Sequence, residues 1–361
     1  MAEQNGASGI KVEAGNTRAF LALPKQLYPT RANPRSYSTE SQLVSGTHTL
    51  CKYFDIHVFT ASRDGRVQSR CALTLYPDDE TAYLGFFDSK DDEEAVRALF
   101  TEAERLALSK GIRRIAGPVD ASFWIGYRMK ANLFGEAPYF GEPCGLPWYQ
   151  RLWEMNGYAV CDWYCSNMYG VSSVYTNRKY SERLTAFLEK GYLIKSPKRS
   201  EWDRIIGEVY ALIMLSFSDF PMFKYMSEDD FRKHYAGLRH IVDFSMVKMA
   251  YQNEKAVGFF ISVPDYGHML NQGTGFLTLA RAYLRRIRPA RYVMLYMGVD
   301  PEHRGLGKAL SQTIIDELLK KQVPSIGALI HQGKVNERYV EDMIEGSYQY
   351  MLFEKYIVNN E

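Results

Sequence analysis

Residues 299–310 read VDPEHRGLGKAL and combine the residue types that can hold an anion. They follow the apolar run YVMLYMG, and Pro301 ends that run before Arg304, Gly305 and Gly307. The first turn of an α-helix leaves backbone N–H groups without intrahelical partners and carries the positive end of the helix dipole. Glycines let a phosphate approach those amides, and an arginine adds charge-assisted hydrogen bonds. The segment therefore predicts a phosphate or pyrophosphate site, although an ordinary helix N-terminus would explain the two glycines alone.

The pattern Val299-x-Pro301, followed by Arg304-x-x-Gly307-x-Ala309, resembles the acyl-CoA-binding signature of the GNAT superfamily of acyl-CoA N-acyltransferases. The resemblance extends over the order of elements from about residue 190 to residue 358. It implies acetyl-CoA or another acyl-CoA as co-substrate, and no metal. Six residues would then cradle the pyrophosphate, and three in the preceding strand would accompany the pantetheine arm. The first set is Arg304, Gly305, Leu306, Gly307, Lys308 and Ala309, and the second is Met297, Gly298 and Val299. Gly298 inside the strand fits a bulge or the close approach of a ligand, and a tolerated strand glycine is the alternative.

The catalytic groups are less well defined by the same resemblance. Family members often use a tyrosine seven residues after the Asn of a late helix to protonate the thiolate, but from Asn336 that count reaches Met343. Tyr339, one helical turn from Asn336, is the replacement candidate, unless it only packs the helix. His331 ends an apolar strand and is the candidate base, with a structural histidine as the alternative. Weaker candidates are Asp265 and His268, and His303 is interpreted as a turn residue.

The elements that must position these residues alternate between strands and helices, which indicates an α/β chain. In the second half we expect a hairpin turning at Asn253–Glu254, a strand over 291–299, a helix over 305–321, a strand over 326–331, a helix over 336–346 and a final strand over 348–358. The first half repeats this order, with strands over 52–61, 67–77 and 81–87, a helix over 93–111, a strand over 112–119 and a helix over 146–158. We interpret this as a duplication. The predicted fold is α/β (α+β), with two tandem GNAT-like domains, residues 1–175 and 176–361. Each has a mixed, mostly antiparallel central sheet flanked by helices.

The first half lacks the anion-binding turn. After the strand that ends in YLGFF, the sequence reads DSKDDEEAV, with no glycine pair and no arginine. Five carboxylates stand there against one lysine: Asp88, Asp91, Asp92, Glu93 and Glu94. Such a charge set opposes a pyrophosphate, so we expect only the second domain to bind the co-substrate.

Composition narrows the choice of partners. Hydrophobic residues make up 46% of the 361 residues and the formal net charge is +2, so we expect a globular protein without nucleic acid as a partner. The start has no apolar signal core, and no run of about 18 apolar residues could span a membrane. We therefore expect a cytoplasmic protein with no membrane partner and with its five cysteines reduced. A homodimer is left open.

Two further stretches bear on the substrate. Residues 216–225, SFSDFPMFKY, could line an apolar cleft for the acceptor or for a long acyl chain, or simply pack the core. Residues 268–291 carry five arginines without an acid: Arg281, Arg285, Arg286, Arg288 and Arg291. These could form a solvated face, contact the nucleotide phosphates of CoA, or bind an acidic acyl-carrier protein; nucleic acid is the least favoured partner.

The sequence therefore predicts an acyl-CoA-dependent N-acyltransferase that moves an acyl group, with acetyl the first candidate, to a primary amine by direct attack. The acceptor is a small-molecule or peptide amine. One alternative is transfer of a fatty acyl group to an amino acid or peptide amine. The other is a protein that binds acyl-CoA without catalysis.

Overall fold

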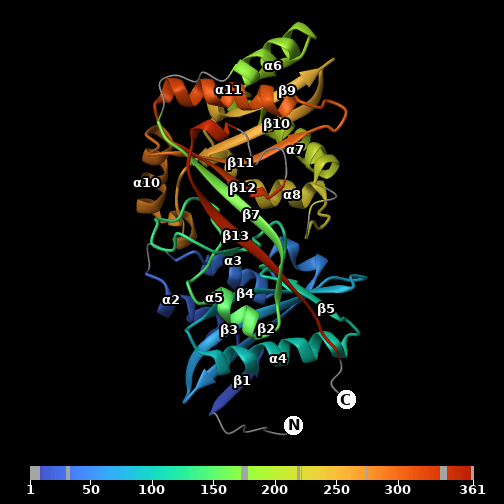
Figure 1. The fold of residues 1–361 in the computed structure, drawn as a ribbon, viewed down its shortest axis with the longest axis vertical. Coiled ribbons are helices and arrows are strands. Elements are labelled where there is room, and N and C mark those ends of the chain that lie inside the picture. Colours follow the sequence, from blue (N-terminus) through green and yellow to red (C-terminus); the bar gives the residue numbers. More distant parts are fainter. Residues whose placement is uncertain are drawn as a thin grey trace. The chain divides into compact units, whose positions relative to one another are not determined.

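The computed structural model describes residues 9–29, 33–171, 178–217, 220, 222–273, 275–333 and 340–358. The chain forms two compact units (Figure 1). The first contains residues 1–163, 267–274 and 349–361, and the second contains residues 164–266 and 275–348. The domain boundary expected at 175/176 stays a prediction, because compactness does not show which segment folds by itself.

The first unit is built on a sheet with strand order β1-β2-β3-β4-β5-β13. Its neighbours are antiparallel except β4 and β5, which run parallel. Its elements are β1 (Ile10–Ala14), α1 (Thr17–Ala22), α2 (Pro24–Leu27), α3 (Tyr37–Val44), β2 (Asp55–Arg63), β3 (Arg66–Leu75), β4 (Thr81–Ser89), α4 (Glu93–Ser109), β5 (Arg114–Gly117), β6 (Met129–Lys130), α5 (Tyr149–Met155) and most of β13 (Ile344–Tyr356).

Helix α4 covers this sheet because its apolar residues recur with helical spacing. Val96, Leu99, Phe100 and Ala103 are all buried, and they pack in a core that also contains Trp153. Phe100 and Trp153 meet edge to face, with their ring centroids 5.2 Å apart. The helix predicted over 93–111 is confirmed.

The second unit has the strand order β7-β12-β11-β10-β9-β8, again with one parallel pair, β11 and β12. Its elements are most of β7 (Ala159–Tyr169), α6 (Arg178–Glu189), β8 (Leu193–Lys195), α7 (Trp202–Ser216), α8 (Glu228–Tyr235), α9 (Leu238–Ile241), β9 (Val247–Gln252), β10 (Lys255–Pro264), α10 (Phe276–Ile287), β11 (Tyr292–Val299), α11 (Leu306–Lys321) and β12 (Ser325–His331). The expected hairpin turn is confirmed, with φ of 47° at Asn253 and 64° at Glu254.

Helices cover both faces of the second sheet. Phe260 of β10 packs with α11 through Leu306 and Leu310, and Phe187 of α6 joins the same core. The next residue, Ile261, points to the opposite face because side chains alternate along a strand, and there it lies with residues of α7. The predicted architecture of mixed, mostly antiparallel sheets flanked by helices is confirmed.

Each unit takes its last strand from the other half of the sequence. Residues Phe353–Tyr356 of β13 pair with β5, and Tyr164–Tyr169 of β7 pair with β12. The helix expected over 336–346 is wrong in its described part. Val340 has a φ of 56°, a left-handed conformation in which a β-branched residue does not continue a helix. Only a 3-10 turn follows, Glu341–Met343, and β13 begins at Ile344.

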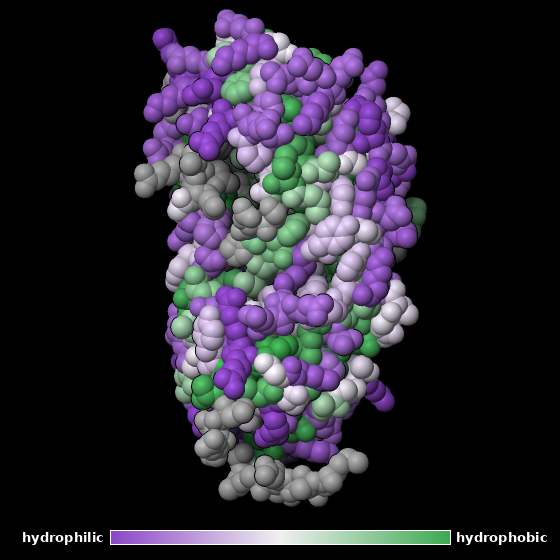
Figure 2. Space-filling model, turned by 90° about the vertical axis from the view of Figure 1, so that its right-hand side faces the viewer, coloured by the Kyte–Doolittle hydropathy of each residue, from purple (hydrophilic) through white to green (hydrophobic). Residues whose placement is uncertain are grey.

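The surface view in Figure 2 is covered mostly by hydrophilic residues, with smaller apolar patches between them. None of the helices that the structure describes combines the length and the apolar character needed to cross a membrane.

Candidate functional site

The two parallel strands of the second unit diverge after three residue pairs. Residues Tyr292–Met294 pair with Ser325–Gly327, and the described ladder between β11 and β12 ends there. A register shift between Ile261 and Ser262 of β10 leaves Leu295 as the extra residue of β11. On β12, Leu329 has a φ of 58°, and its N–H donates to Ser166 Oγ. The irregularities bend both strands where they separate, so backbone groups on their facing edges become accessible to a ligand.

A cavity of about 750 Å³ occupies this opening, within the usual size of a small-molecule site. Its walls come from the diverging strands, one face of α11 from Gly307 to Leu319, α6, and the ends of α7 and β7. Among its lining residues are Tyr169, Arg183, Ser216, Phe217, Phe220, Leu295, Met297, Gly298, Val299, Asp300, Arg304, Gly305, Gly307, Lys308, Leu329, Ile330, His331, Val340 and Met343.

The N-terminus of α11 closes one end of the cavity. Gly305 caps the helix with a φ of 92°, a conformation that strains any residue with a Cβ, and no side chain accepts from the first turn. Leu306 N–H donates to His303 O at 3.1 Å. Within the described residues, the amides of Arg304, Gly305 and Gly307 donate to no protein acceptor. These are the conditions under which a helix N-terminus can bind a phosphate.

Three cations line the same end of the cavity: Arg304 and Lys308 at the start of α11, and Arg183 on α6. A Cβ built on Gly305 would lie 3.6 Å from Arg183 Nε, which places this guanidinium beside the turn. The sequence did not reveal Arg183, since nothing local connects its helix to the glycine turn. Asp300 also lines the cavity, but its carboxylate is buried and accepts from Glu302 N–H.

The strand residues proposed to accompany the pantetheine arm, Met297, Gly298 and Val299, all line the cavity. Val299 O accepts from Ser216 Oγ at 3.1 Å. Gly298 has a packing role, because a Cβ there would lie 2.5 Å from Phe259 Cε1 on the neighbouring strand. The bulge that a glycine suggested lies instead at Leu295.

Of the three main catalytic candidates, His331, Asn336 and Tyr339, the structure describes His331 only. Its ring lies edge-on to Tyr164, with centroids 4.9 Å apart, and also contacts Phe220. Nδ1 lies 2.8 Å from Gln332 O, and if Nδ1 carries the proton then Nε2 is the basic nitrogen. Asn336 and Tyr339 lie outside the described residues, whereas Met343, at the position of the family's tyrosine, lines the cavity.

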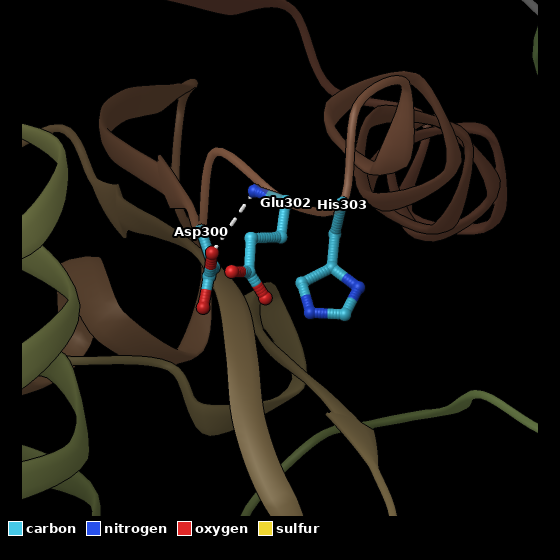
Figure 3. Close-up of side chains that lie close together, drawn as sticks. All are labelled: Asp300, Glu302 and His303. Carbon is cyan, nitrogen blue, oxygen red and sulfur yellow. Dashed lines mark hydrogen bonds between the residues drawn. The ribbon is translucent and has the colours of Figure 1, made fainter.

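Figure 3 shows the turn before α11, where Asp300, Glu302 and His303 bring potential metal-ligand atoms together. The contacts of this group explain it as turn structure. Asp300 accepts from Glu302 N–H at 3.0 Å, and His303 Nδ1 lies 2.6 Å from Tyr192 OH. His303 is therefore placed as the predicted turn residue. The weaker base candidate Asp265 pairs with Arg291 at 2.5 Å.

The equivalent strand pair of the first unit is closed by its own chain. Strands β4 and β5 pair over Thr81–Tyr83 and then separate, but residues 117–128 fill the gap. Val119 N–H donates to Leu84 O, and Phe86 N–H donates to Asp120 Oδ1. A Cβ on Gly85 would lie 1.8 Å from Val119 O, so no space remains for a ligand arm there.

The N-terminus of α4 is also occupied. Asp92 accepts from Ala95 N–H at 3.1 Å and pairs with Arg63 at 2.9 Å. Asp88, expected in the acidic loop, lies instead in β4 and is fully buried against Arg35 and Arg70. Burial opposes ionisation of Asp88, but the two guanidinium groups outweigh it and lower its pKa. At the N-terminus of α4, the carboxylate of Asp92 thus takes the place that a phosphate would need.

Comparisons with known proteins agree on the fold. No family model and no curated sequence matches this chain. Among solved structures, it is similar to a tandem GNAT protein from the clavulanic acid biosynthesis pathway, with 13% identity, a TM-score of 0.50, and coverage of 97% of this chain and 100% of that one. It is also similar to the GCN5-related glucosamine N-acetyltransferase region of a fungal multi-domain GH3 β-N-acetylglucosaminidase, with 13% identity and a TM-score of 0.54. This match covers 97% of this chain and 38% of that one. A third similar structure is a GCN5-related N-acetyltransferase from Sphaerobacter thermophilus, with 10% identity and a TM-score of 0.50. This match covers 96% of this chain and 95% of that one. At sequence identities of 10–13%, this similarity shows the fold alone.

Proposed function

Because the chain has the tandem GNAT fold, we propose that its second unit is an acyl-CoA-dependent N-acyltransferase acting on a primary amine. One observation carries the proposal: the cavity between β11 and β12 ends at an α11 N-terminus with unoccupied amides and three cations. A pyrophosphate fits the charge and the donors of that end, and a thin polar arm fits between the separated strands.

The chemistry needs a free amine and a leaving thiolate. A lysine-like amine has a pKa of about 10.4, so roughly one molecule in a few thousand is unprotonated at neutral pH. Its lone pair attacks the thioester carbonyl carbon, a C–N bond forms, the C–S bond breaks, and the sulfur leaves with the bonding electrons. The amine loses one proton and the thiolate gains one, so the proton count balances.

His331 is the candidate base because it lines the cavity at the end of β12. Tyr339 as the thiolate acid, with Asn336 beside it, stays a prediction. The cytoplasmic location, the possible homodimer and an acyl-carrier partner are also untested expectations. Asn336 and Tyr339 belong to residues 334–339, which the structure does not describe.

A fatty acyl donor is the second candidate, favoured by one specific observation. Phe217 and Phe220 line the cavity with their ring centroids 5.6 Å apart, and Ile330 adds another apolar wall. Such a surface can bury an alkyl chain at about 0.8 kcal/mol per CH₂ group. A donor series from acetyl-CoA to palmitoyl-CoA decides between the two. Activity that rises with length and falls in Phe220→Ala supports the fatty donor, and activity confined to acetyl-CoA excludes it.

The proposal is tested by two measurements on the full chain. Calorimetry should detect CoA binding, and a thiol-reactive chromophore should detect CoA release when acetyl-CoA meets a panel of primary amines. Absence of CoA binding would refute the assignment. Binding without thiol release, across amines and donor lengths, would support a non-catalytic acyl-CoA-binding protein instead.

A further inference from the structure

Helix α10 exposes an apolar face that nothing in the described structure covers. Phe276 is 84% exposed and Leu284 is 63% exposed, although such side chains are usually buried. The large exposed residues of the helix are Phe276, Leu277, Leu279, Tyr283, Leu284 and Ile287. Ala282 is its one residue counted as buried. None of the residues of α10 lines the cavity of the candidate site.

The apolar residues form one stripe along the helix. Residues advance by about 100° around a helix axis, so positions 276, 280, 283, 284 and 287 share one side. Ala282 lies on the opposite side and is buried, and α9 packs against the helix. The stripe therefore points away from the rest of its unit, and α10 lies at the margin of that unit in Figure 1.

Basic residues flank the stripe. Arg281 and Arg288 are exposed along one edge, and Arg286 lies on the other edge, where its Nη1 donates to His240 O. Arg285 is exposed on the side away from the stripe. No acidic residue occurs between Asp265 and Asp300. The neighbouring α9 contributes another exposed arginine, Arg239. The helix and the segments next to it in sequence thus carry arginines and no carboxylate.

We propose that α10 binds the surface of a membrane that contains anionic lipids, with its apolar stripe inserted among the acyl chains and its arginines at the phosphates. Interfacial helices combine an apolar face carrying Phe and Leu with a basic polar face, as α10 does. With 12 residues, α10 is about 18 Å long and lies along the surface rather than across the bilayer. This inference goes beyond the N-acyltransferase function and departs from the expectation of no membrane partner.

A protein partner fits the same surface less well. The stripe lies on a single helix of 12 residues, about 18 Å long. The large side chains project from the convex surface of one helix, which by itself does not fix the shape of a partner. A lipid surface needs no complementary shape and is held by apolar insertion plus charge.

The test uses sedimentation of the full chain with vesicles of phosphatidylcholine alone or with about 30% phosphatidylglycerol. Binding is expected only to the anionic vesicles, and it should weaken with salt because the charge contribution is screened. Phe276→Ser with Leu284→Ser should abolish binding. Arg281→Gln with Arg288→Gln should weaken it about 25-fold, since each basic residue near the surface contributes about fivefold.

Matched controls separate the stripe from general surface effects. Leu188→Ser changes a half-exposed leucine on α6, and Arg97→Gln changes an exposed arginine on α4. Both should bind like the wild type, and thermal melting should show that all variants stay folded. Three results would overturn the proposal: no binding to anionic vesicles, equal binding by the Phe276/Leu284 variant, or a dimer that this variant converts to a monomer. Acyl transfer to a soluble amine is measured in parallel, so failure of one proposal does not mask the other.

Discussion

Replacing Arg304 by Gln should weaken CoA binding by a specific and modest amount. The guanidinium lines the phosphate end of the cavity, but the residue is exposed to solvent. A hydrogen bond to a charged group contributes about 1.5–3 kcal/mol, and solvent screening puts Arg304 at the low end of that range. A loss of about 1.5 kcal/mol corresponds to a dissociation constant about 12 times larger.

The measurement compares two ligands by calorimetry. CoA carries the pyrophosphate, and pantetheine has the same arm without it. Arg304→Gln should weaken CoA binding and leave pantetheine binding unchanged, and Arg183→Gln should behave in the same way. The matched control is Lys320→Gln, which removes an exposed cation from the last turn of the same helix. It should bind both ligands like the wild type.

Two results would refute this reasoning. Equal weakening for CoA and pantetheine would mean that Arg304 shapes the cavity rather than contacting phosphate. Unchanged CoA binding in the double variant of Arg304 and Arg183 would mean that the pyrophosphate lies elsewhere. In both cases, melting curves that match the wild type would exclude unfolding as the cause.

Three further predictions concern residues whose surroundings the structure defines. Gly298→Ala should destabilise the fold by about 1–3 kcal/mol in urea unfolding, because its Cβ meets Phe259 at 2.5 Å; adding Phe259→Leu should restore part of the loss, and no loss would contradict the packing role. Asp88→Asn should cost about 1.5–3 kcal/mol at pH 7 by removing the charged acceptor that Arg35 and Arg70 share, while Asp120 and Glu40 still pair with them. Because the folded-state pKa of Asp88 is lowered, the stability that its ionised carboxylate contributes is complete above the unfolded pKa of about 3.9 and is lost as pH falls through the folded pKa. A difference in unfolding free energy between the wild type and Asp88→Asn that persists at the lowest pH would contradict this. Burial raises the pKa of Cys144 to about 12, so at pH 8 iodoacetamide should modify it about 1000-fold more slowly than an ordinary thiol until the chain is denatured; rapid native-state labelling, followed by mass spectrometry, would argue against this.

The sequence predicted those parts of the site that depend on neighbouring residues. The helix at 305–321 and the strand at 291–299 follow from local periodicity and from the proline and glycine turn, and both are confirmed as α11 and β11. His331 could be placed at a strand end for the same reason. The sequence could not show that Asp88 lies in β4 rather than in the acidic loop, because its burial depends on Arg35 and Arg70 from distant segments.

Features that depend on long-range pairing could not be predicted. The exchange of β7 and β13 joins residues far apart in the sequence, such as Tyr169 with Ser325 and Phe353 with Gly117. Arg183 reaches the glycine turn only because α6 packs on α11. The helix expected from residue 336 failed where Val340 adopts a left-handed conformation, and no local pattern signals that change.

The two units differ most at the place where a parallel strand leads into a helix. In the second unit, Gly305 is the N-cap of α11, no side chain caps the first turn, and strands β11 and β12 separate after three residue pairs. In the first, Asp92 caps α4 and Val119 fills the opening between the strands. A carboxylate held against the first amides and paired with Arg63 supplies the negative charge that a ligand would otherwise bring. The first unit therefore keeps the helix N-terminus stable without a ligand, whereas α11 gains the corresponding stabilisation only when an anion binds. This difference predicts that CoA raises the melting temperature of the second unit and leaves that of the first unit unchanged.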